Sequence, residues 1–192
     1  AKGVEAFRWD ARNGIQGLGD LPGSVVYSDG VDVSADGSVI VGSGLLEPGR
    51  EAFRWTVDTG MVALGEPPGG AHNSQATGVS GDGSVVVGHS IVLPGTVGNL
   101  TAAFVWDSHY GMRELRQALI DMGVSGFAQW NLPIASDVSS DGRTIVGSGL
   151  NPQGQSEGFI VRLPEAGDVT ADGQVNISDL LEVIGHWGAC PA

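Results

Sequence analysis

The sequence of 192 residues contains almost no cysteine and little positive charge. Its single cysteine, Cys190, cannot form an internal disulfide framework or a cysteine-based zinc cluster. Nine basic residues stand against 22 acidic ones, which gives a formal net charge of −13, and no Lys/Arg cluster interrupts the acidity. Nucleic acid and anionic lipid are therefore poor partners, because both bind positive surfaces, whereas hard cations are suitable ones.

Long apolar runs are also lacking, so the sequence predicts no membrane span, which needs roughly 20 apolar residues. The first residues, AKGVEAF, contain neither an apolar signal-peptide core nor an initiating Met, so we expect a mature, trimmed or partial chain. Glycine, in contrast, is plentiful, with 32 residues set between short runs of Val, Ile, Phe and Trp. This arrangement is typical of turns between strands and predicts an all-β body.

A repeat of about fifty residues runs through the chain. EAFRW at Glu5, EAFRW at Glu51 and AAFVW at Ala102 align with one another, and EGFIV at Glu157 begins a fourth copy. Phenylalanines 7 and 53 lie 46 residues apart, and the Asp-Gly pairs at 82 and 141 lie 59 apart. Such periods predict four-stranded antiparallel units in a propeller-like or open β array.

Alternation within each copy predicts which side chains are buried. Residues two apart on a strand share a face, so the Phe and Trp of each copy should point together into a core. The residues predicted to be buried are Phe7, Trp9, Phe53, Trp55, Phe104 and Trp106. The Asp-Gly pairs at 36, 82 and 141 predict two-residue type I′ hairpin turns. Each is followed by a strand that we expect to end at Gly42, Gly88 or Gly147.

The third copy contains an insertion at residues 111–133. Met112, Leu115, Leu119 and Met122 recur there at helical spacing, which predicts one short helix with an apolar, core-facing stripe.

The repeat resembles the HAF repeats of secreted bacterial proteins in three features. These are the triplet that ends in Phe two residues before the Trp, the Leu-Gly segment that follows it, and the strand after the Asp-Gly pair. Glu-Ala-Phe stands in the place of the His-Ala-Phe triplet at residues 5–7 and 51–53. The resemblance covers roughly residues 3–163 and implies an extracellular or cell-surface location. A helical insertion in the last unit resembles the way such repeat regions end, which implies that further units lie upstream. We assign residues 1–163 to this β-repeat domain.

The remaining residues, 164–192, contain DVTADGQVNISD, which has the spacing of a twelve-residue calcium loop. Calcium takes about six to eight oxygen ligands, so such a loop needs oxygens at alternate positions, a glycine at the sixth and an acid at the twelfth. Gly173 fills the sixth position, and Gln174 would offer its backbone oxygen. The predicted metal ligands are Asp168, Thr170, Asp172, Gln174, Asn176 and Asp179. The three body turns lack an acid at the twelfth position, so we predict calcium only in the C-terminal segment.

The loop leads into LLEVIGHWG, which has apolar residues on one helical face. A calcium loop with Asp at the twelfth position, followed by a helix, resembles a dockerin type I repeat. That resemblance covers residues 167–188. Dockerins carry two such repeats and bind cohesins, so it implies a cohesin-like partner, although only one repeat is present.

No residues are assigned to catalysis. The four histidines fall at unrelated points of the repeat, and the glutamates that recur before the aromatic strand are expected to be architectural. We therefore expect a non-enzymatic, secreted or cell-surface structural or adhesive protein whose calcium-binding tail mediates attachment or self-assembly. A propeller-like module that binds glycan or peptide is the alternative, and a non-catalytic fragment of a secreted enzyme is a third hypothesis.

Because the β body begins and ends within a repeat, we also expect copies to complete or stack on one another as an oligomer or filament.

Overall fold

The computed structural model describes residues 3–22, 26–92 and 101–164. These ranges contain 13 strands and one helix, so the predicted all-β fold class with one helical insertion is confirmed. In the described part of the chain, no helix is long and apolar enough to cross a membrane.

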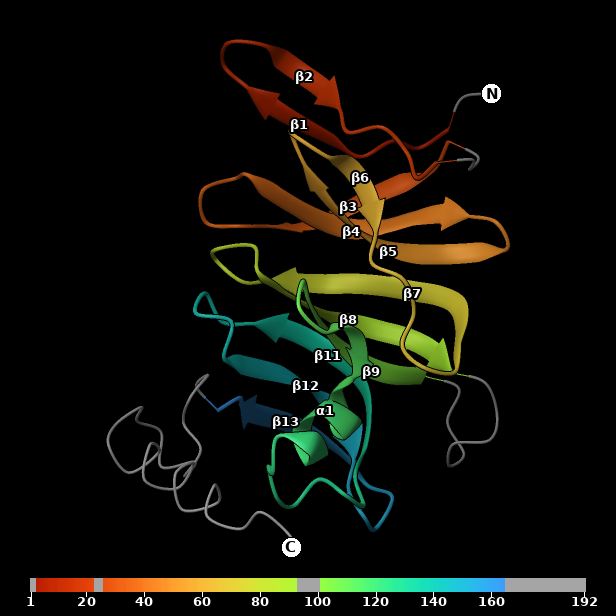
Figure 1. Ribbon diagram of the computed structural model, residues 1–192, viewed down its shortest axis with the longest axis vertical. Helices are drawn as coiled ribbons and strands as arrows, with labels where there is room; N and C mark the ends of the chain where they lie inside the picture. Colours follow the sequence, from red (N-terminus) through yellow and green to blue (C-terminus); the bar gives the residue numbers. More distant parts are fainter. Residues whose placement is uncertain (1–2, 23–25, 93–100, 165–192) are drawn as a thin grey trace, which may run out of the picture.

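The strands form four units, which follow one another along the longest axis of the molecule (Figure 1). Unit 1 contains β1 (Phe7–Asp10) and β2 (Gly14–Gly17). Unit 2 contains β3 (Ser28–Val33), β4 (Val39–Leu46), β5 (Gly49–Thr56) and β6 (Gly60–Ala63). Unit 3 contains β7 (Gly70–Val79), β8 (Val85–Val92), β9 (Thr101–Asp107) and β10 (Gly111–Glu114), followed by helix α1 (Leu115–Asp121). Unit 4 contains β11 (Asn131–Val138), β12 (Thr144–Leu150) and β13 (Ser156–Arg162).

Neighbouring strands within a unit pair antiparallel, and units 2 and 3 have the four strands that the repeat predicts. One parallel contact, at equivalent positions, joins units 1 and 2 and another joins units 2 and 3. Val4 pairs with Tyr27 between units 1 and 2, and Arg50 pairs with Asn73 between units 2 and 3. Each sequence repeat is divided between two units, because the strand after an Asp-Gly turn pairs with the Phe strand of the next copy.

The Asp-Gly turns differ from the predicted type I′ hairpins. A type I′ turn needs positive φ at both central residues, but in the first turn only the glycine, Gly37, has it, at 74°. The amide of Gly37 bonds the carbonyl of Ser34, and the amide of Ser34 bonds the carbonyl of Val39. Each turn is thus a four-residue loop, stabilised by side chains that flank the Asp-Gly pair.

The strands that follow these turns are longer than predicted, and their glycines lie in the middle rather than at the end. Gly42, for example, lies within β4 and is paired with Phe53 of β5. A Cβ on Gly42 would lie 1.9 Å from the carbonyl oxygen of Asp29, so no larger residue fits without movement of the neighbouring strand.

The apolar core lies between units rather than within them. Three clusters of buried side chains fill the three junctions. Between units 1 and 2 they are Ala6, Leu18, Leu21, Phe53, Trp55 and Met61. Between units 2 and 3 they are Val39, Val41, Ala52, Leu64, Ala76, Val79, Val86, Phe104 and Met112. The third cluster, between units 3 and 4, includes Leu115, Ala118 and Leu119 of α1.

The helix therefore has the predicted position and role, but it begins three residues later than its apolar stripe. Met112 lies in β10, where it pairs with Trp106, and only Leu115 and Leu119 of the stripe lie within the helix. Met122, at the C-cap, packs against the same cluster.

The predicted burial of the aromatic strand is correct in units 2 and 3, where Phe53, Trp55 and Phe104 are buried and Trp106 is half-buried. It is wrong in unit 1. Phe7 and Trp9 are 62% and 66% exposed. The aromatic face of each strand packs against the preceding unit, and no preceding unit lies against unit 1 in the described structure.

Candidate functional site

The six predicted calcium ligands, Asp168, Thr170, Asp172, Gln174, Asn176 and Asp179, all lie outside the described residues. The structure therefore brings none of them together, and the calcium site stays a prediction. Within the described ranges, no three His, Cys, Asp or Glu side chains form a possible metal site.

The Asp-Gly turns of the body are held by hydrogen bonds between protein groups. Asp36 accepts bonds from the amide of Ser38 at 2.9 Å and from the hydroxyls of Ser38 and Ser34 at 2.7 and 2.8 Å. These bonds lower the pKa of Asp36 to about 2, the bonds from Ser38 having the largest effect. The equivalent bonds lower the pKa of Asp82 and of Asp141. Each carboxylate therefore closes its own turn.

The same turns also connect the units. The amide of Ala35 bonds the carbonyl of Gly81 at 2.9 Å, and the amide of Gly81 bonds the carbonyl of Ser140 at 2.9 Å. The three turns thus form a ladder that runs from unit 2 to unit 4. This geometry explains why the Asp-Gly pairs recur.

The recurring glutamates also have local partners. Glu5 accepts a bond from the amide of Gly19, and Glu157 accepts one from the side chain of Asn151 at 2.7 Å. Glu51 is buried, and its Oε1 lies 3.3 Å from Nδ1 of His72. Each glutamate contacts only neighbouring parts of the fold, so these acids do not converge on one site.

The three described histidines lie in different elements, namely β7, β8 and the turn between β9 and β10. His72 pairs with Glu51, and His109 stacks edge-to-face on Tyr110. His89 lies in β8, where burial lowers its pKa and its Nδ1 has no hydrogen-bond partner. No two of these histidines share a partner in the described structure.

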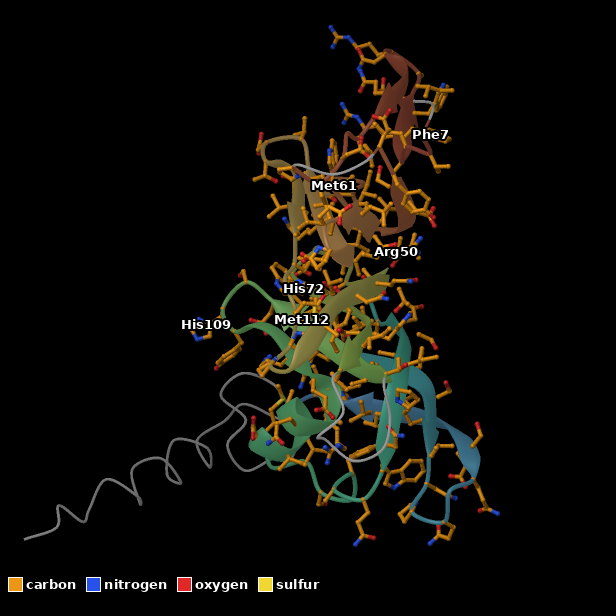
Figure 2. All side chains as sticks on the ribbon, turned by 90° about the vertical axis from the view of Figure 1, so that its right-hand side faces the viewer. Phe7, Arg50, Met61, His72, His109 and Met112 are labelled. Atoms are coloured by element: carbon orange, nitrogen blue, oxygen red, sulfur yellow. The ribbon has the colours of Figure 1, made fainter. Side chains whose placement is uncertain are left out.

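Units 1, 2 and 3 each contain an aromatic triad. The triad consists of Phe and Trp from one strand and, opposite the Trp, Met or Ile from the next. In unit 2 the triad is Phe53, Trp55 and Met61, and all three are buried against unit 1. Figure 2 shows Met61 and Met112 inside the stack, and Phe7 near its N-terminal end.

We call the unit 1 triad, Phe7, Trp9 and Ile15, the N-terminal face. Ile15 is 72% exposed and pairs with Trp9 across the hairpin. The opposite end of the stack, in unit 4, exposes Val146 of β12 and Ile160 of β13, which we call the C-terminal face. Sequence alternation predicted that Phe7 and Trp9 share a face but not that it is exposed.

Comparison with known proteins reveals the fold only. No family model and no curated protein sequence matches the chain significantly. Among solved structures, TolB from Acinetobacter baumannii has a TM-score of 0.50 at 13% identity, covering 83% of this chain and 35% of its own. A TolB from Agrobacterium tumefaciens has a TM-score of 0.50 at 15% identity, covering 84% of this chain and 55% of its own. The chain thus spans about a third to a half of the length of these structures, and its fold is propeller-like.

Proposed function

We propose that this propeller-like module is a non-enzymatic structural or adhesive part of a secreted or cell-surface protein. Residues 164–192 bind one calcium ion and mediate attachment, either to another copy or to a cell-surface protein such as a cohesin-like partner.

One observation carries the structural role: the residues that recur with the repeat serve packing between units. The aromatic triads fill the junctions, and the Asp-Gly turns form a ladder across them. The recurring glutamates bond to nearby groups instead of facing one pocket. A catalytic acid is needed once, whereas a packing residue is needed in every unit.

The calcium part of the proposal rests on the spacing of DVTADGQVNISD and on the acidity of the chain. Carboxylates at Asp168, Asp172 and Asp179 would repel one another without a cation. Calcium at about a hundred times its dissociation constant should stabilise the folded segment by roughly 2.7 kcal/mol.

Calorimetric titration of calcium into the whole chain tests this proposal. We expect one site, which Asp172→Ala abolishes. Asp82→Ala is the matched control, because Asp82 also precedes a glycine but is bonded by Ser80 and Ser84 within its own turn. Calcium binding that survives Asp172→Ala and is lost in Asp82→Ala would place the site in the body and overturn the assignment.

A further inference from the structure

The turn between β1 and β2 contains Asn13-Gly14, and no other Asn-Gly pair occurs in the sequence. In such a pair the glycine nitrogen attacks the side-chain carbonyl carbon of the asparagine through a five-membered ring, and no Cβ hinders the approach. Asn13 is exposed, and Gly14 has a φ of 70° with no atom within 4 Å of the place that a Cβ would occupy. The pair is therefore sterically open to this reaction.

The exposure of Asn13 belongs to its position in the unit. The pairs Asp10–Gly14, Thr56–Gly60 and Asp107–Gly111 close the equivalent hairpins of units 1, 2 and 3. Thr59 and Tyr110, which precede the last glycine as Asn13 does, are exposed although a preceding unit packs against units 2 and 3. A unit packed against unit 1 would thus leave this turn accessible as well.

Asp10 holds the turn closed. Its Oδ1 accepts hydrogen bonds from the amides of Arg12 at 2.9 Å and Asn13 at 2.7 Å, and its Oδ2 accepts one from Nδ2 of Asn13 at 3.1 Å. These bonds, first of all that from the Asn13 side chain, lower the pKa of Asp10, so the carboxylate is ionised at neutral pH. Attack by Gly14 requires this turn to open, and the end of a hairpin of two four-residue strands opens readily.

The Asp-Gly pairs of the body offer a contrast. The amide of Gly37 donates a hydrogen bond of 2.9 Å to the carbonyl of Ser34, which engages the nitrogen that would attack. The pKa of Asp36 is lowered to about 2, so its side chain is a carboxylate, which is a poor electrophile. The turns at Asp82 and Asp141 share both features. We therefore expect the reaction at Asn13 and not at these aspartates.

We propose that Asn13 is a site of spontaneous deamidation in the folded protein, and that the bonds to Asp10 set its rate. The nitrogen of Gly14 bonds to Cγ of Asn13, the Cγ–Nδ2 bond breaks, and the amide proton of Gly14 leaves with the side-chain nitrogen as ammonia. Water then opens the cyclic imide at either carbonyl, which yields aspartate or isoaspartate.

Either product weakens the turn. The new carboxylate replaces the Nδ2 donor and repels the carboxylate of Asp10. Isoaspartate also lengthens the backbone by one methylene, so the Asp10–Gly14 pair is lost. The site is independent of the calcium segment, and the two proposals are tested by separate experiments.

Mass spectrometry of tryptic peptides from the whole chain, incubated at about pH 8 to favour removal of the amide proton, tests the proposal. Peptide 13–50 contains Asn13 and no other asparagine. We expect it to gain about 1 Da as the amide becomes a carboxylate, with isoaspartate at residue 13 and none at residue 36. Asn13→Gln keeps an amide but not the five-membered ring, so the mass gain should disappear.

Asp10→Ala should accelerate the reaction about fivefold or more, because the hydrogen bonds that keep the turn closed are lost. Asp107→Ala is the matched control. Its carboxylate accepts the amides of His109 and Tyr110 in the equivalent turn of unit 3, so the rate at Asn13 should not change.

Three results would overturn the proposal. A wild-type peptide 13–50 of constant mass excludes the reaction. A mass gain that persists in Asn13→Gln places the reaction at Gln16, the other amide side chain near the start of the peptide. Equal rates in wild type and Asp10→Ala show that the turn bonds do not control the reaction.

Discussion

Phe104 in β9 lies directly opposite Gly88 in β8, and two atoms of its ring lie 2.7 Å from the position that a Cβ on Gly88 would occupy. The same pairing joins Phe53 to Gly42 and Phe159 to Gly147. The aromatic ring thus covers a glycine on the neighbouring strand. Each ring then fills the junction with the preceding unit.

Gly88→Ala should destabilise the protein by about 1–3 kcal/mol, because its Cβ would lie 2.0 Å from the carbonyl oxygen of Gln75 and overpack the core. Gly158→Ala is the control. A Cβ there meets its nearest atom, the carbonyl oxygen of Gly147, at 3.8 Å, so a change within about 0.5 kcal/mol is expected. Urea unfolding measures both, and equal losses would contradict the role of Gly88.

Trp55→Ala should cost about 3–5 kcal/mol of unfolding free energy, since it removes a buried ring from the junction of units 1 and 2. Trp9→Ala removes the equivalent ring of unit 1, which is exposed, and should change stability by no more than about 0.5 kcal/mol. Thermal unfolding at low concentration compares the two. A large loss in Trp9→Ala would show that the N-terminal face is covered within one molecule.

Acid should weaken the turns. The pKa of Asp36 is about 2 in the folded protein, so between about pH 4 and pH 2 the unfolded chain binds a proton that the folded chain does not. The stability contributed by this carboxylate is therefore complete above that window and is lost as the pH falls through it. Asp36→Asn should flatten the dependence of the urea midpoint on pH in that range, and an unchanged slope would contradict the hydrogen-bonded turn.

His89 gives a second pH dependence, at a higher pH. Burial lowers its pKa, so below about pH 6.5 the unfolded chain takes up a proton more readily than the folded chain. Stability should decrease as the pH falls from about 7 toward 5. His89→Ser should remove this decrease, since serine stands at the equivalent positions 43 and 148. His109→Ser, at an exposed site, is the control that should retain it.

Much of this fold could be predicted from the sequence because the signals are local. Alternation in EAFRW and its copies marks the strands, the Asp-Gly pairs mark the hairpins, and the spacing from Met112 to Met122 marks the helix. The type I′ geometry was wrong because Ser34 and Ser38 bond the carboxylate of Asp36 and stabilise a longer loop. That error reflects side-chain bonds that the Asp-Gly pair alone does not reveal.

The calcium ligands were predicted on the same local basis, since one loop of twelve residues would supply them all. The exposure of Phe7, Trp9 and Ile160 was not. Period-two alternation determines that Phe7 and Trp9 share a face and that Ile160 points away from Phe159, but it does not determine whether another unit covers that face. Tertiary structure decides this, because each Asp-Gly hairpin pairs with the Phe strand of the next copy and each triad is buried only by the unit before it.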